Sequence, residues 1–88
     1  MNDLDNLRKK IDEIDDNIVK LLLERFAVVK NIADYKKEHG IEIFQKNRET
    51  EILKNIADKI DKTKNQAYKK YILDIYETIL QTSKSSQQ

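Results

Sequence analysis

A continuous seven-residue repeat of apolar side chains runs from residue 4 to residue 35, and it constrains the fold more than any other feature of the chain. The apolar positions alternate three and four apart: Leu4, Leu7, Ile11, Ile14, Ile18, Leu21, Val28, Ile32 and Tyr35. This spacing is typical of a helix that packs along one stripe against other helices. The repeat is interrupted at one position, where Arg25 stands in place of an apolar residue.

Arg25 therefore directs a positive charge into the packed stripe. Burying an arginine is costly unless an anion meets it. A charge in such a stripe has two interpretations: it fixes the register of the packed helices, or it begins an anion-binding site. The repeat alone leaves both open.

The composition predicts an all-α protein with one small domain, residues 1–88. The chain has no proline and one glycine, which favours helix throughout. The absence of cysteine excludes disulfides and thiolate metal sites and favours a cytoplasmic location, and the acidic, amphipathic N-terminus does not resemble a signal peptide. No apolar run is long enough for a membrane span. With 17 basic and 16 acidic residues, the chain offers no basic face for nucleic acid or anionic lipid.

Capping signals predict three helices. The first runs from about Asp3 or Asp5 to about His39, and Gly40 supplies the left-handed residue that ends it. The second covers roughly residues 47 to 60, with Asn47 as its N-cap and an apolar face at Ile52, Leu53, Ile56 and Ile60. The third begins near Gln66 and reaches Thr82 or beyond, with Tyr68, Ile72, Ile75 and Ile79 on one stripe. The tail SKSSQQ has no apolar residue, which is typical of a frayed end.

The first helix is too long for a monomeric globule of this size. It should measure about 54 Å, whereas a compact chain of this length has a diameter of roughly 30 Å. Part of its apolar stripe therefore needs cover from a second chain. The simplest closed solution is an intertwined two-fold homodimer in which each long helix spans both halves.

Several polar residues are placed so that they could form one site. Arg25 and Lys36 lie about 20° apart around the first helix and about 16 Å apart along it, so they could bracket a pocket. Arg8 lies about 25 Å from Arg25, and only a partner chain could bring it to the same ligand. Arg48 and Glu49 open the second helix, where free N–H groups favour an anion.

Ser83 continues the stripe of the third helix, and Gln87 follows one turn later, so both point inward if that helix extends far enough. Taken singly, these residues have ordinary structural interpretations. Arg8 could be a solvated flanking charge and Lys36 a partner of the helix dipole, while Ser83 and Gln87 could be tail residues. The chain has no Ser-His-Asp set, metal-ligand spacing or glycine-rich loop, so neither a metal nor a cofactor is expected.

Taken together, the set resembles the all-helical chorismate mutases (type II, AroQ class) over essentially the whole chain. The resemblance rests on LR at 7–8, ID at 11–12 and 14–15, LLLER at 21–25, Lys36, RE at 48–49 and S-x-x-x-Q at 83–87. It implies an intertwined three-helix homodimer that converts chorismate to prephenate, on the route to phenylalanine and tyrosine.

The resemblance also implies a role for each residue. Arg25 and Arg48 would hold the substrate carboxylates, together with Ser83 and with Arg8 from the partner chain. Lys36 and Gln87 would donate hydrogen bonds to the ether oxygen, and Glu49 would accept one from the ring hydroxyl. Gln45 departs from the family, which often has an aspartate there, so this substrate-binding position would act through its backbone or bind the hydroxyl less well. The catalytic group would comprise Arg25, Lys36 and Gln87.

Two other functions fit parts of the pattern. An isochorismate pyruvate lyase shares the fold, but the lyase is expected to have an apolar residue where this chain has Glu49. A non-catalytic helical dimerisation module would need no arginine in the stripe, and Arg25→Leu would then stabilise the protein without loss of function.

Overall fold

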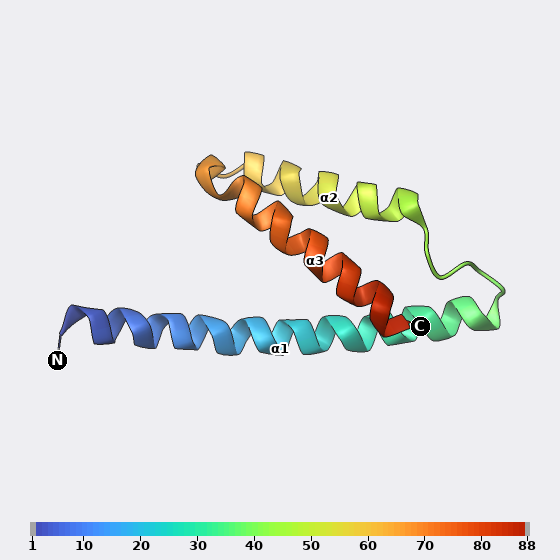
Figure 1. The fold of residues 1–88 in the computed structure, drawn as a ribbon, viewed down its shortest axis with the longest axis horizontal. Helices are drawn as coiled ribbons and strands as arrows, with labels where there is room; N and C mark the ends of the chain where they lie inside the picture. The colour runs from blue at the N-terminus through green and yellow to red at the C-terminus, as the bar shows by residue number, and fades with distance from the viewer. Residues whose placement is uncertain (1, 88) are drawn as a thin grey trace.

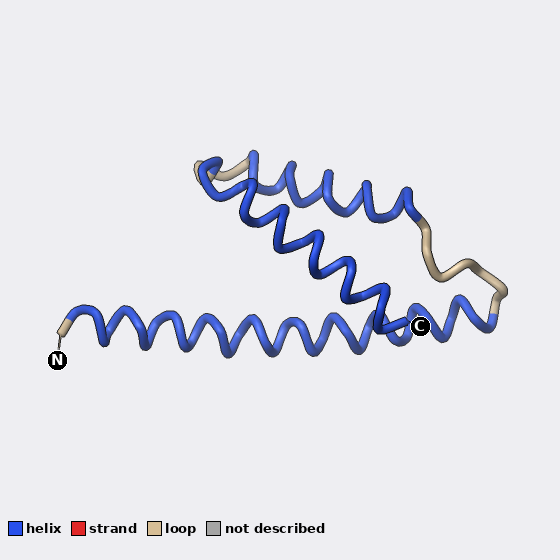
Figure 2. Tube along the Cα trace, in the orientation of Figure 1, coloured by secondary structure: helices blue, strands red, loops and turns tan. Residues whose placement is uncertain are grey.

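The computed structural model describes residues 2–87, and within them it contains helices and loops but no strand (Figure 2). The helices are α1 (Asp3–Glu38), α2 (Lys46–Asp61) and α3 (Lys69–Gln87), with a short 3-10 helix, η1 (Gln66–Tyr68), directly before α3. Figure 1 shows α1 as a straight rod, while α2 and α3 form an antiparallel hairpin whose C-terminal end returns to α1. The all-α prediction is confirmed.

The ends of α1 follow from local capping. The side chain of Asn2 accepts a hydrogen bond from the backbone N–H of Asp5 at 2.8 Å, which satisfies one of the free donors of the first turn. At the other end, Gly40 adopts a positive φ of 65°, and the N–H of Ile41 bonds to the carbonyl of Lys36 at 2.8 Å. The single glycine therefore ends α1 as predicted and turns the chain back toward its own last turns.

Two predicted features of the hairpin differ in the structure. Asn47 is not the N-cap of α2: the helix begins at Lys46, and its N-cap is Gln45, which has extended backbone and makes no side-chain capping bond. The polar tail is not frayed up to Gln87, because α3 continues to that residue. The hydroxyls of Ser83 and Ser85 donate within this helix, to the carbonyls of Ile79 and Gln81. Gln88 lies outside the described residues.

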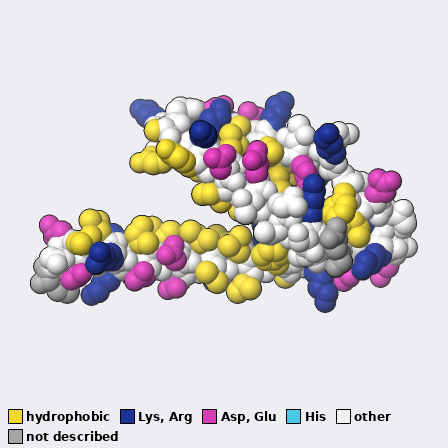
Figure 3. Space-filling view, in the orientation of Figure 1, with side chains coloured by type: hydrophobic (Ala, Val, Ile, Leu, Met, Phe, Trp, Pro, Cys, Tyr) yellow, Lys and Arg dark blue, Asp and Glu magenta, His cyan; other side chains and the backbone are white. Residues whose placement is uncertain are grey.

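Much of the apolar repeat on α1 stays uncovered. The molecule extends 57 × 26 × 17 Å and has a radius of gyration of 16.5 Å, so α1 outreaches the hairpin. In the N-terminal part of α1, Leu7, Ile11 and Ile14 remain between 52% and 57% exposed. Figure 3 shows hydrophobic side chains on α1 facing an open wedge beneath the hairpin. We call the exposed repeat positions in this part of α1 the free seam: Leu4, Leu7, Ile11, Ile14, Ile18 and Leu21.

The buried residues lie toward both ends of the hairpin. Ala33 of α1 and Leu80 and Ser83 of α3 are in the region where the end of α3 approaches α1, and Ile60 of α2 is near the turn that joins α2 to α3. None of the helices in the described part of the chain is long and apolar enough to cross a membrane. The same residues contain no cluster of three or more acidic or histidine side chains arranged to hold a metal ion.

Candidate active site

A cavity of about 300 Å³ lies between the C-terminal half of α1, the connector at residues 39–45, the start of α2 and the end of α3. Its walls combine charged, polar and apolar side chains: Arg25, Val29, Ile32, Lys36, Ile43, Phe44, Gln45, Arg48, Glu49, Ile52, Leu80, Ser83, Lys84 and Gln87. Seven of the eight residues predicted to form a site are therefore brought together, although they come from distant parts of the sequence. A concave, largely apolar pocket with a few polar groups is typical of a small-molecule site.

Arg25 is partly buried, and its Nη1 donates a hydrogen bond to the hydroxyl of Ser83. Ser83 is 6% exposed, and its hydroxyl donates in turn to the carbonyl of Ile79 at 2.8 Å. This chain of bonds fixes the guanidinium against α3. Because a guanidinium has five N–H donors, the bond to Ser83 engages only part of its donor capacity.

Lys36 reaches the cavity from the last turns of α1. Its Nζ donates to the backbone carbonyl of Ile43 at 2.8 Å, so the ammonium group also ties the connector down. The turn at Gly40 makes this contact possible, because it folds the connector back across the end of α1. Gln45, the last lining residue of the connector, is exposed.

The first turn of α2 contributes a cation and an anion. Arg48 pairs with Glu51 at 2.7 Å, but the two side chains are 59% and 61% exposed, so the pair is weak and leaves the guanidinium able to turn toward a ligand. Glu49 is more enclosed at 28% exposed, and its Oε1 lies 2.8 Å from the Nζ of Lys84 on α3. Glu49 thus has a fixed partner inside the cavity wall.

Gln87 lies at the C-terminal end of α3 and is partly buried. Its amide nitrogen donates to the carbonyl of Ser83 at 3.3 Å, and its Oε1 is buried without a hydrogen-bond partner. A side-chain amide carries two N–H donors, so this one long bond leaves a second donor. Gln87 therefore lines the cavity with an amide that is incompletely hydrogen-bonded within the described residues.

Arg8 is the predicted site residue that the single chain does not bring to the cavity. It is exposed on the first turns of α1, 17 positions before Arg25, which corresponds to about 25 Å along the helix. Lys84 also lines the cavity, although it was not among the residues predicted from the sequence. The spacing of Leu80, Lys84 and Gln87 places these residues on one helical face, and that spacing was the available signal.

The fold and the cavity define a small all-helical protein with four cationic side chains, from α1, α2 and α3, around one carboxylate. The chain belongs to the chorismate mutase type II family, which it matches over residues 7–88.

Two curated relatives share part of this match. The chain is 46% identical over 59 residues to a chorismate mutase of Methanocaldococcus jannaschii, which covers 67% of this chain and 56% of the relative. It is 41% identical over 56 residues to a bifunctional chorismate mutase/prephenate dehydratase of Aquifex aeolicus, covering 64% of this chain and 16% of that protein. The matched segment therefore spans only part of each relative.

Proposed function

We propose that the protein is an isomerase that rearranges chorismate to prephenate in the cytoplasm, as a step toward phenylalanine and tyrosine. The observation that carries this proposal is the convergence of Arg25, Lys36 and Arg48 on one cavity of a chain that belongs to the chorismate mutase type II family. Chorismate carries two carboxylates, and fixed cations on different helices suit such a dianion.

The reaction is a unimolecular Claisen rearrangement: the ether C–O bond breaks while a new C–C bond forms, and no proton is transferred. A protein can accelerate it by holding the reactive conformer and by stabilising charge as it develops. This chemistry needs no nucleophile and no general base. It therefore suits a cavity whose polar groups are cations, amides, one serine hydroxyl and one carboxylate.

We assign the substrate contacts as the resemblance to the type II chorismate mutases implies, using residues that line the cavity. Arg25, oriented by Ser83, and Arg48 hold the carboxylates, and Glu49 accepts a hydrogen bond from the ring hydroxyl. Lys36 and the second N–H of Gln87 donate to the ether oxygen, where negative charge builds in the transition state. Gln45 also lines the cavity, and we propose that it contributes through its backbone.

We further propose that two chains form an intertwined two-fold dimer. The free seam of α1 and the open wedge beneath the hairpin support this. A second α1 entering the wedge would cover the free seam and the hydrophobic side chains of the hairpin that face it. Arg8 of that second chain would then complete the cationic set. Within this arrangement residues 1–88 act as one domain with two sites per dimer.

The test is a spectrophotometric assay of chorismate loss with product analysis, run in parallel with isochorismate. We expect prephenate from chorismate and no pyruvate from isochorismate. Lys36→Ala should lower turnover about 100-fold or more, because it removes a donor aimed at developing charge. Lys30→Ala, which removes an exposed lysine of the same helix, serves as the control. Unchanged turnover of Lys36→Ala would remove Lys36 from the site, and pyruvate release would replace the proposal by the lyase.

A further inference from the structure

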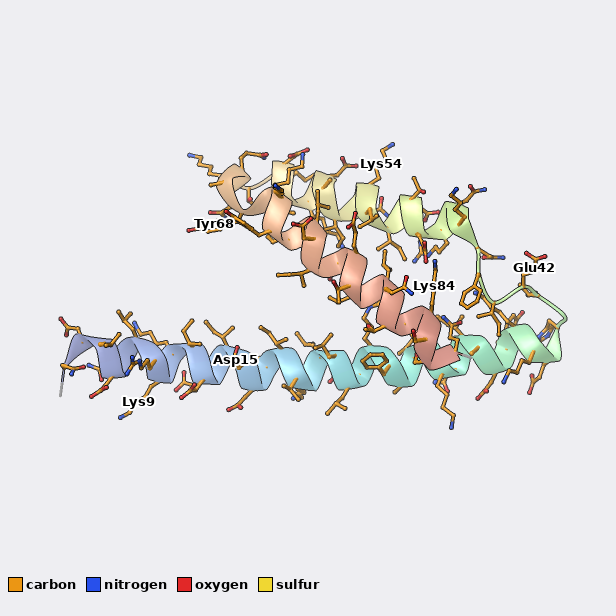
Figure 4. The ribbon with its side chains drawn as sticks, in the orientation of Figure 1. Lys9, Asp15, Glu42, Lys54, Tyr68 and Lys84 are labelled. Carbon is orange, nitrogen blue, oxygen red and sulfur yellow. The ribbon has the colours of Figure 1, made fainter. Side chains whose placement is uncertain are left out.

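Lys84 joins three elements around the cavity. It belongs to α3, its Nζ lies 2.8 Å from Oε1 of Glu49 on α2, and the same Nζ lies 5.8 Å from the centroid of the Phe44 ring in the connector. Figure 4 shows the Lys84 side chain extending from α3 toward the start of α2. An ammonium group at this distance from an aromatic face gains a cation–π interaction in addition to the ion pair.

A second ion pair between the same two helices provides a comparison. Lys69 of α3 and Asp61 of α2 lie 2.8 Å apart at the opposite end of the hairpin, with exposures of 33% and 46%. Neither residue lines the cavity. The two pairs are thus similar ties between α2 and α3, and they differ in that one of them borders the candidate site.

The ion pair between Lys84 and Glu49 restrains the Glu49 side chain, which we propose to contact the substrate. A carboxylate offers two oxygens with about four acceptor positions, so one bond to Lys84 leaves Glu49 able to accept from a ligand. A free glutamate side chain samples several rotamers, and ordering it on substrate binding costs conformational entropy. The ion pair with Lys84 orders the Glu49 side chain before the ligand binds.

We propose that Lys84 is a positioning residue: it holds the Glu49 carboxylate in the direction from which it accepts the ring hydroxyl of the substrate. This inference rests on the proposed function. By positioning Glu49, Lys84 would determine specificity for substrates that carry the ring hydroxyl. The hydroxyl contact exists in the ground state and the transition state alike, so its loss should appear in KM more than in kcat.

The experiment compares chorismate with its analogue in which hydrogen replaces the ring hydroxyl. Lys84→Met removes the charge but keeps an unbranched chain, Lys84→Arg keeps the charge, and Lys69→Met removes the equivalent tie outside the cavity. For chorismate, Lys84→Met should raise KM about tenfold, as expected for a weakened hydrogen bond to a charged group. For the analogue, the KM of Lys84→Met should stay near the KM of the wild-type protein for the same analogue. Lys84→Arg and Lys69→Met should retain the wild-type preference.

A double substitution separates positioning from a general effect on the cavity. If Lys84 acts through Glu49, then Lys84→Met added to Glu49→Gln should cause no further loss of hydroxyl preference. Circular dichroism checks that each variant folds, and Lys84→Ala replaces Lys84→Met if the latter does not.

The outcomes distinguish this inference from the function on which it rests. Equal KM changes for both substrates, or equal behaviour of Lys84→Met and Lys69→Met, would reduce Lys84 to a structural tie and overturn the inference alone. A further loss of preference in the double variant would also overturn it. A folded wild-type protein that does not consume chorismate would overturn the proposed function and this inference with it.

Discussion

Replacing one isoleucine of the free seam should weaken the proposed dimer by an amount that the structure sets. Ile14 is 52% exposed in the single chain, so a partner would cover about half of its surface. Complete burial of such a side chain contributes roughly 1.5–3 kcal/mol, and covering half of it contributes about 0.8–1.5 kcal/mol. A two-fold axis repeats the contact, so Ile14→Gln should cost about 1.5–3 kcal/mol per dimer, or about 10- to 100-fold in the dissociation constant.

Sedimentation equilibrium on wild type and Ile14→Gln measures this difference. The control is Asp16→Gln, an exposed position on the outer face of the same helix, which should leave the dissociation constant unchanged. Glutamine is a good helix former, so neither variant should lose helicity through local propensity. If the partner supplies Arg8, chorismate turnover of Ile14→Gln should also rise with protein concentration as dimers reform.

Two results would refute the reasoning. A wild-type protein that sediments as a folded monomer at all concentrations would show that nothing covers the free seam. A dissociation constant for Ile14→Gln no higher than that for Asp16→Gln would show that the interface lies elsewhere.

Three further predictions follow from the site and the hairpin. Arg8→Ala and Arg25→Ala proteins, each inactive alone, should recover activity when refolded together, because a mixed dimer holds one site without either substitution; confirmed heterodimers that stay inactive would argue against shared sites. Gln87→Glu should gain activity as the pH falls toward the ordinary glutamate pKa of about 4.3, since only the protonated acid donates, and a flat rate–pH profile would contradict the donor role. Hydrogen bonds from Lys69 and Gln66 lower the pKa of Asp61, so this carboxylate should stabilise the fold at neutral pH and lose that effect as the pH falls through its folded-state pKa. The free energy of unfolding in urea should therefore be lower for Asp61→Asn than for wild type at pH 7, and the two values should converge in acid.

The sequence predicted most of the fold because each helix carries its own local signals. The seven-residue repeat and the single glycine located α1, which runs from Asp3 to Glu38. The start of α2 was less predictable, because asparagine is the better cap by propensity, whereas the N-cap in the structure is Gln45, two residues before Asn47. The end of α3 beyond Thr82 was left open, because the serine-rich tail has no apolar periodicity that would mark it as helix.

The site was predictable as a set of residues but not as a set of contacts. Helical spacing placed Arg25 and Lys36 on one face, and position along the other helices singled out the remaining candidates except Gln45. The resemblance added Gln45 and the role of each residue. Spacing along one helix cannot reveal which residue of another helix comes near it, so the partners of Arg25 and Glu49 emerged only from the packing of α3. Arg8 shows the same limit between chains, because its expected ligand lies on a surface that one chain does not complete.

The uninterrupted length of α1 has a consequence for how the gene can vary. One rod connects Arg8 at one end to Arg25 and Lys36 at the other, with no loop between them to absorb a change. Inserting or deleting one residue in that stretch would rotate one end against the other by about 100°, and a whole added heptad would displace it by about 10 Å. The outer face of the rod can therefore accept many substitutions, while its residue count between these positions is expected to be fixed.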